Sequence, residues 1–152
     1  MTPRLVQAFD APVLAVALAV LDPWRRLGYS AAALERYLLR DDPALTRMVL
    51  EREGNAVAVL ALRRPWLRGP YVELLAVLPQ ARGGGLGRVL LDWAAAQAGD
   101  GGNLWACVSD FNTSARAFYV RQGFVEVAPL PDLVAEGAGE ILLRKRINST
   151  AD

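Results

Sequence analysis

The spacing of hydrophobic and polar residues divides the first half of the chain into short stretches of different period. The predicted elements are, in order, a strand at 5–9, helices at 11–21 and 31–39, and strands at 45–51, 56–62 and 71–78. Asp22-Pro23 ends the first helix, and Ser30 is a suitable N-cap for the second. The strand at 71–78 is the most apolar one, so we expect it at the centre of a sheet.

The second half of the chain continues from a glycine-rich turn at 82–87. The predicted elements are a helix at 88–98, a strand at 104–108, a helix at 112–122, a strand at 124–127 and, after a loop containing Pro129 and Pro131, a last strand at 140–146. The sequence shows no repeat and no linker. This order predicts one α/β domain over residues 1–147, followed by a frayed tail at 148–152.

The composition of the 152 residues excludes several kinds of site and partner. Because the chain has no His, the usual zinc ligand sets and nucleophiles activated by a His base are absent, and we expect no metal. The net charge of +1 argues against a nucleic-acid partner. The apolar run at 11–21 is too short to span a membrane and lacks signal-peptide flanks, so we expect no membrane partner. Cys107 has no cysteine to pair with, which favours a packing role and a cytoplasmic protein.

The glycine-rich turn lies between a buried strand and a helix, a position that favours an anion site. Without Cβ atoms, the backbone N–H groups at the start of the helix can approach a phosphate or pyrophosphate closely. A Walker P-loop would require Lys and Ser or Thr after Gly87, where the chain has Arg88-Val89. The dinucleotide fingerprint also fails, because its third glycine would fall on Arg88. We therefore expect a different phosphate-containing ligand.

Two motifs lie around this turn and in the helix at 112–122. Arg82, Gly85 and Gly87 satisfy the pattern R/Q-x-x-G-x-G/A within the string VLPQARGGGLGRVLL. Further on, NTSARAFY runs from Asn112 to Tyr119 and is followed by QGF. At these residues the chain resembles the GNAT superfamily of acetyl-CoA-dependent N-acetyltransferases. The resemblance implies a single-domain α/β fold with a mixed central sheet, splayed at a CoA cleft and flanked by about four helices.

The resemblance also implies roles for individual residues, with acetyl-CoA as the acyl donor. The corresponding cofactor-binding residues are Leu75, Val77, Arg82, Gly83, Gly84, Gly85, Leu86, Gly87, Arg88, Asn112 and Ala115. Tyr119 would protonate the departing thiolate as a general acid. Strand alternation places Glu73 on the same face as Leu75 and Val77, which makes it the candidate general base. The alternative for Glu73 is a structural carboxylate paired with an Arg.

The expected reaction is direct attack of a primary amine on the acetyl thioester, with a small molecule or a peptide as acceptor. Trp24, Arg25, Arg26 and Tyr29 lie in the region that shapes the acceptor pocket in the family, although a hinge packed by aromatics is an equal alternative. The sequence of this region does not identify the acceptor. Homodimers are common in the superfamily, but the sequence shows no interface. The alternative function is a non-catalytic acyl-CoA-binding module on the same fold.

Overall fold

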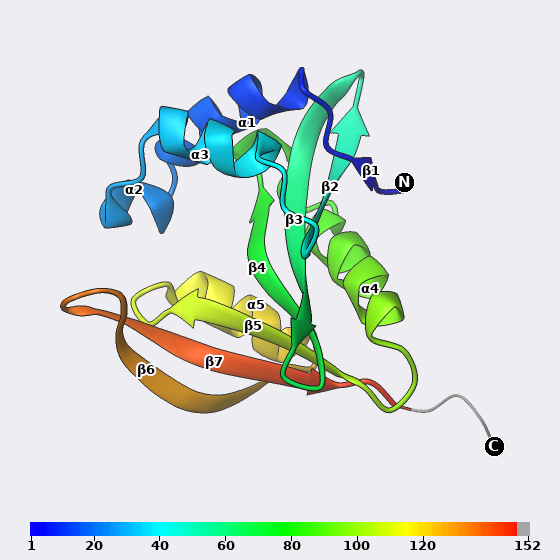
Figure 1. The fold of residues 1–152 in the computed structure, drawn as a ribbon, viewed down its shortest axis with the longest axis vertical. Coiled ribbons are helices and arrows are strands. Elements are labelled where there is room, and N and C mark those ends of the chain that lie inside the picture. The colour runs from blue at the N-terminus through cyan, green and yellow to red at the C-terminus, as the bar shows by residue number, and fades with distance from the viewer. Residues whose placement is uncertain (149–152) are drawn as a thin grey trace.

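A mixed seven-stranded sheet runs through the chain, seen in a computed structural model that describes residues 1–148 (Figure 1). The spatial order of the strands is β1-β2-β3-β4-β5-β7-β6. Among the described strands, β4 and β5 form a parallel pair at the centre, and the other neighbours are antiparallel. The strands are β1 (Arg4–Leu5), β2 (Leu45–Arg52), β3 (Asn55–Trp66), β4 (Gly69–Val77), β5 (Asn103–Ser109), β6 (Val125–Ala135) and β7 (Ala138–Arg146).

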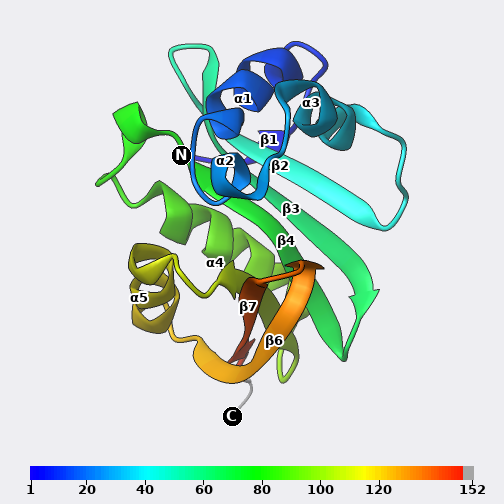
Figure 2. The ribbon, with the colours of Figure 1, turned by 90° about the vertical axis from the view of Figure 1, so that its left-hand side faces the viewer.

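Helices cover both faces of the sheet (Figure 2). Three of them, α1 (Asp10–Ala19), α2 (Trp24–Leu27) and α3 (Ala31–Leu39), lie together on one side. On the other side lie α4 (Leu86–Ala98), which follows the 3₁₀ turn η1 (Pro79–Ala81), and α5 (Thr113–Arg121). Within residues 1–148, no helix has the length and apolar character needed to cross a bilayer.

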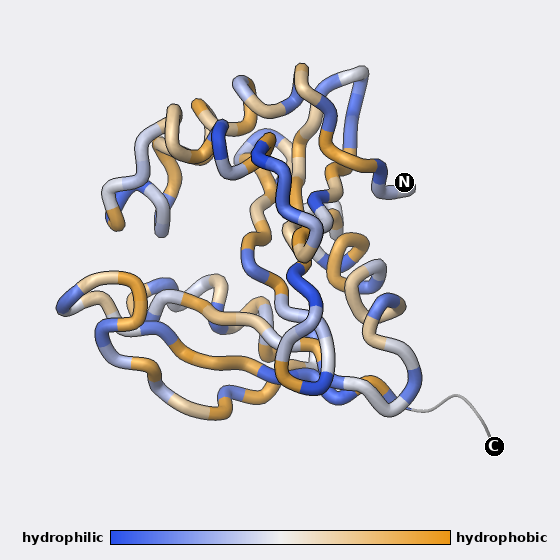
Figure 3. The backbone as a smooth tube through the Cα atoms, in the orientation of Figure 1, coloured by the Kyte–Doolittle hydropathy of each residue, from blue (hydrophilic) through white to orange (hydrophobic). Residues whose placement is uncertain are grey.

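Each helical layer packs on its own apolar cluster. Leu60, Leu90 and Leu104 belong to the cluster beneath α4 and α5, whereas Leu14 and Val59 belong to the cluster beneath α1 and α3. Val59 and Leu60 are neighbours on β3 and face opposite clusters, as the two-residue period of a strand requires. The long apolar run of β3 is therefore buried on both faces, and Figure 3 shows mostly hydrophobic residues along the central strands.

The predicted strands and the four predicted helices are confirmed in their order, with differences at some element ends. The helix predicted at 31–39 has those bounds, and the Ser30 hydroxyl caps it by accepting a hydrogen bond from the Ala33 N–H at 3.1 Å. The opening strand is shorter than predicted and ends at Leu5. Asp10 pairs with Arg4 at 2.8 Å and accepts a hydrogen bond from the Gln7 N–H at 2.7 Å, so the chain turns early into α1.

Two further differences concern elements that the local pattern does not show. The short helix α2 was not predicted, because four residues carry no periodic signal. The strand β6 continues to Ala135 through Pro129 and Pro131, where we predicted a loop. Since β6 is an edge strand, a proline without an N–H can be accommodated on its unpaired side. Of the predicted tail, residues 149–152 lie outside the described residues.

Candidate active site

The sheet opens where β4 and β5 separate. The two strands pair at Tyr71 with Trp105 and at Val72 with Ala106, and beyond these pairs they diverge (Figure 1). Because β4 continues to Val77, the edge of this strand that faces the gap has backbone N–H and C=O groups with no neighbouring strand among the described residues. An extended ligand can pair with these groups in the manner of an added strand.

A β-bulge lies at the same point of β4. Two consecutive residues of β3 pair with Val72 and Leu74, which leaves Glu73 as an extra residue. The bulge reverses the alternation, since Val72 belongs to the cluster beneath α4 and Leu74 to the cluster beneath α1 and α3. Leu75 and Val77 pack against the α4 cluster, whereas the Glu73 side chain contacts α3. The expectation that Glu73 shares a face with Leu75 and Val77 is therefore wrong.

Two clefts meet in the gap between β4 and β5. The larger one, of about 990 Å³, lies along the end of β4, the glycine loop and the start of α5. The smaller one, of about 620 Å³, lies between the α2–α3 region and the strands β5, β6 and β7. Six residues line both clefts: Pro23, Trp24, Leu75, Asn112, Ala115 and Tyr119. Two molecules, one bound in each cleft, would therefore meet beside Leu75 and Tyr119.

The glycine loop has the geometry of an anion site. Gly83 and Gly85 have left-handed backbones, with φ of +84° and +77°, which glycine adopts readily. Gly85 is the N-cap of α4 and no side chain caps this helix, so the N–H groups of its first turn are left for an external acceptor. Gly87 has no positive φ, but a Cβ there would lie 2.9 Å from Cζ of Phe118, so the Phe118 ring would have to shift to admit a larger residue. Gly84 lines neither cleft.

The other residues predicted to bind the donor lie together in the larger cleft. Asn112 is the N-cap of α5, and its side-chain oxygen accepts a hydrogen bond from the Ala115 N–H at 3.2 Å. Arg82 and Arg88 flank the glycine loop and bring positive charge to it. The members of the predicted set that line this cleft are Leu75, Val77, Arg82, Gly83, Gly85, Leu86, Gly87, Arg88, Asn112 and Ala115.

Tyr119 extends from α5 to the junction of the two clefts. Its side chain is 6% exposed and makes edge contacts with the rings of Phe118 and Phe124, at centroid distances of 5.6 and 5.2 Å. Burial raises the pKa of the phenol well above its usual value, and the nearby Cys107 thiol raises it further. The hydroxyl therefore stays protonated at neutral pH and can act as a proton donor.

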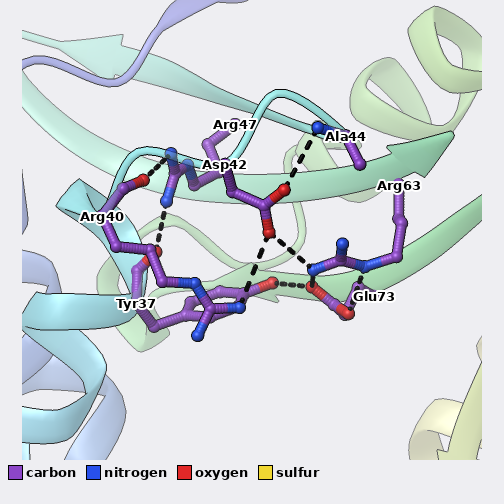
Figure 4. Close-up of polar contacts among 7 residues, drawn as sticks. All are labelled: Tyr37, Arg40, Asp42, Ala44, Arg47, Arg63 and Glu73. Atoms are coloured by element: carbon purple, nitrogen blue, oxygen red, sulfur yellow. Dashed lines mark hydrogen bonds and ion pairs between the residues drawn. The ribbon is translucent and has the colours of Figure 1, made fainter.

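Glu73 lines the smaller cleft, but its carboxylate is already engaged (Figure 4). Arg63 donates from Nε to Oε1 at 2.8 Å and from Nη2 to Oε2 at 3.1 Å. The Tyr37 hydroxyl donates to Oε2 at 2.7 Å, and Asp42 extends the network by pairing with Arg63 at 3.1 Å. This geometry is that of the arginine-paired alternative. The role of Glu73 as a base stays a prediction.

The four residues that were candidates for the acceptor pocket, between the first two predicted helices, lie in different places in the structure. Trp24 and Tyr29 line the smaller cleft, and Arg25 lines the larger one. Arg26 lines neither, and its guanidinium lies 4.0 Å from the centroid of the Phe111 ring. Two of the four residues therefore contribute to the wall of the smaller cleft.

Two buried polar side chains in the smaller cleft were missed by the sequence reasoning. Ser109 on β5 and Glu140 on β7 are cross-strand partners and are 2% and 9% exposed. Within the described part of the chain, Ser109 Oγ and Glu140 Oε2 have no hydrogen-bond partner. A local pattern places Glu140 at the start of a strand, but its burial depends on the pairing of β7 with β5, which the pattern does not contain.

Comparison with known proteins agrees with this geometry. A family model described as the acetyltransferase (GNAT) family matches residues 19–124. The matched segment includes both sequence motifs and the gap between β4 and β5. No curated protein sequence gives a significant match.

Solved structures share the fold over nearly the whole chain. An acetyltransferase from Thermus thermophilus is 26% identical, with 97% of this chain and 98% of that chain covered and a TM-score of 0.73. The ribosomal-protein-alanine N-acetyltransferase from Brucella melitensis is 23% identical, with 97% and 100% covered and a TM-score of 0.72. An aminoglycoside 6'-N-acetyltransferase complexed with coenzyme A is 16% identical, with 100% of both chains covered and a TM-score of 0.74. At such identities the last two show similarity of fold.

Proposed function

Because the chain belongs to the acetyltransferase (GNAT) family, we propose that it transfers an acetyl group from acetyl-CoA to a primary amine by direct attack. The observation that carries the proposal is the meeting of two clefts in the gap between β4 and β5. One cleft contains a loop suited to a pyrophosphate. The other is a separate space for an acceptor, and molecules bound in the two would meet beside Tyr119.

Acetyl-CoA fits the larger cleft in an extended form. Its pyrophosphate would accept hydrogen bonds from the first-turn N–H groups of α4, in the favourable field of the helix dipole. Arg82 and Arg88 would add charge at the same place. The pantetheine arm would pair with the open edge of β4 at Leu75 and Val77, and the thioester would then lie near Leu75.

The chemistry follows from this placement. The amine nitrogen attacks the thioester carbonyl carbon, and a backbone N–H near Leu75 stabilises the oxyanion that forms. The C–S bond then breaks, and the Tyr119 hydroxyl gives its proton to the departing sulfur. The position of Tyr119 at the junction of the two clefts supports this role, and its phenol is protonated at neutral pH.

The acceptor remains a small-molecule amine or a peptide amine in this proposal. The structural neighbours include enzymes named for a ribosomal-protein alanine and for an aminoglycoside, two different classes of acceptor. Cys107 is a free thiol, which supports a cytoplasmic location. The alternative, a non-catalytic acyl-CoA-binding module, is less well supported, because it gives no role to a buried phenol at the junction of the clefts.

Release of free CoA thiol tests the proposal. The purified protein is mixed with acetyl-CoA and a panel of amines and amino-terminal peptides, and thiol release is followed with time. We expect release that depends on the amine. Calorimetric binding of CoA without turnover on any amine would favour the binding module, and absence of CoA binding would overturn both functions.

A further inference from the structure

We propose that Glu140 binds the ammonium group of the acceptor and removes its proton, and that the acceptor is an amine with a single positive charge on an apolar body. This inference rests on the proposed acetyl transfer and names the acceptor class of that reaction. It comes from the smaller cleft, where Glu140 and Ser109 are neighbours on adjacent strands.

Within residues 1–148, the carboxylate of Glu140 is buried and forms no ion pair. Its side chain is more than nine-tenths buried, and Oε2 has no hydrogen-bond partner among the described residues. Ser109 Oγ, which lines the same cleft, is also without a partner in this part of the chain. Burial of an unpaired charge is costly unless a ligand supplies the missing partner. An ammonium group has three donors and matches two such acceptors.

Glu73, the other carboxylate that lines this cleft, has no free oxygen with which to bind an ammonium group. Both oxygens of Glu73 accept hydrogen bonds from Arg63, and one of them also accepts from Tyr37. An incoming ammonium would have to displace Arg63 or Tyr37 to bind there with the same geometry. Of the two carboxylates that line the cleft in the described chain, Glu140 is therefore the one with an unpaired oxygen.

The charged side chains that line the smaller cleft favour an acceptor with one cation. The remaining charged side chains of the lining are Glu73, which Arg63 neutralises, Arg36, and Arg40, which pairs with Asp42 at 3.8 Å. A polycationic amine would bring further ammonium groups toward two arginines. Much of the rest of the wall is aromatic or aliphatic, including Trp24, Leu27, Tyr29, Leu34, Leu133 and Val134. Such a surface suits a hydrophobic amine, and aromatic rings also attract a cation.

The groups around Glu140 favour its use as a base. Burial raises the pKa of its carboxyl group, and the charge of Asp110 adds to this rise. Tyr71 of β4 and Cys107 of β5 are the other titratable groups that face it. A carboxylate with a raised pKa accepts a proton from an ammonium more readily than an exposed one does.

Glu140 and Tyr119 together account for the protons that move in the reaction. Glu140 takes the first proton of the ammonium, which frees the nitrogen lone pair, and later gives it to solvent. The nitrogen forms the C–N bond, the C–S bond breaks, and Tyr119 gives its proton to sulfur. The second proton, lost from nitrogen as the amide forms, replaces the one lost by Tyr119. The third hydrogen remains on the amide.

Steady-state kinetics of three variants test this assignment. The acceptors are 2-phenylethylamine, with one charge and an aromatic body, and spermidine, with three charges. We expect kcat/KM for 2-phenylethylamine to exceed kcat/KM for spermidine at least tenfold. Glu140→Gln should lower kcat/KM for 2-phenylethylamine at least about tenfold at neutral pH, because the loss of one charged hydrogen bond usually has an effect of this size. Glu140→Asp, which keeps a carboxylate, should recover part of the rate. Glu136→Gln, at an exposed position in the turn between β6 and β7, is the matched control and should not change it.

A pH series separates a base from a purely structural residue. For the wild type, kcat/KM should fall toward acid as Glu140 is protonated, and this limb should disappear in Glu140→Gln while calorimetric CoA affinity stays unchanged. Wild-type kinetics in Glu140→Gln would overturn the role of Glu140, and preference for spermidine would overturn the acceptor class. Both results would leave acetyl transfer intact. Absence of thiol release with every amine would instead overturn the proposed function, and this inference with it.

Discussion

Replacement of Gly85 by alanine tests the glycine loop independently of the rest of the donor cleft. Gly85 has a φ of +77°, and a Cβ added there would meet no atom within 4 Å. The backbone of its neighbour Gly84 is not left-handed, and a Cβ there would meet Arg52 Nη2 at 3.6 Å and the Ala81 carbonyl at 3.8 Å, which are ordinary contacts. The two positions therefore differ in backbone strain and not in available space. Gly84→Ala is the matched control.

The expected loss of stability follows from the backbone. An L-residue in the left-handed conformation costs about 1–2 kcal/mol. Each kcal/mol shifts Tm by about 2–4 °C in a domain of this size. Gly85→Ala should therefore lower Tm by about 2–8 °C. Gly84→Ala should leave Tm nearly unchanged, because its backbone needs no left-handed conformation.

The expected loss of CoA affinity comes from the N–H groups of α4. The loop can relieve its strain by rotating residue 85 toward negative φ, and this rotation turns the first-turn N–H groups away from the pyrophosphate. Each charged hydrogen bond lost is worth about 1.5–3 kcal/mol, so CoA affinity should fall at least about tenfold. Calorimetry measures the affinity, and thermal unfolding measures Tm. A Gly85→Ala protein with lowered Tm and unchanged CoA affinity would refute the pyrophosphate assignment.

The remaining predictions concern Tyr119, Glu73 and Asp10. Tyr119→Phe keeps the ring contacts, so CoA affinity should persist while turnover falls by about 10²–10⁴, measured by thiol release; unchanged turnover would remove its role as an acid. A pH–rate series on Glu73→Gln decides between its two roles. A rate that climbs toward the pKa of the amine assigns the base to Glu73, and a profile parallel to the wild type, which the ion pair with Arg63 favours, makes Glu73 structural. Burial raises the pKa of Asp10, but hydrogen bonds from Arg4 and the Gln7 N–H outweigh this and hold it below its usual range. The stability from Asp10 is therefore present above the unfolded pKa of about 3.9 and lost as pH falls through the folded value. Asp10→Asn should lower Tm at pH 7 and weaken its dependence on acid, and identical Tm curves against pH would contradict this.

Elements with strong local signals could be predicted from the sequence. The bounds of α3 follow from the Ser30 cap and the apolar period, and α5 follows from the cap at Asn112 and the glycine after its end. The anion loop is also local, because a strand, a run of glycines and a helix are adjacent in the chain. The extension of β6 through Pro129 could not be predicted, since its place at the edge of the sheet is a property of the whole topology.

The two acidic residues of the smaller cleft show what local patterns omit. The orientation of Glu73 depends on a bulge in the pairing of β4 with β3, and no residue type in β4 signals that bulge. The burial of Glu140 depends on its register with Ser109, about thirty positions earlier in the chain. Candidate donor-binding residues were found because they are contiguous, whereas the acceptor wall is assembled from α2, α3, β5 and the β6–β7 hairpin.

The six residues shared by the two clefts divide the chain into a part that must stay constant and parts that can vary. CoA is the same molecule for every acceptor, so the glycine loop and the end of β4 must keep the same ligand-binding geometry whichever amine is used. The smaller cleft takes much of its wall from segments that the larger cleft does not use, namely α3, Leu133, Val134 and Glu140. Substitutions in those segments can alter which amine is accepted while donor binding is inherited unchanged. A descendant of this chain could acquire a new acceptor through the β6–β7 hairpin alone.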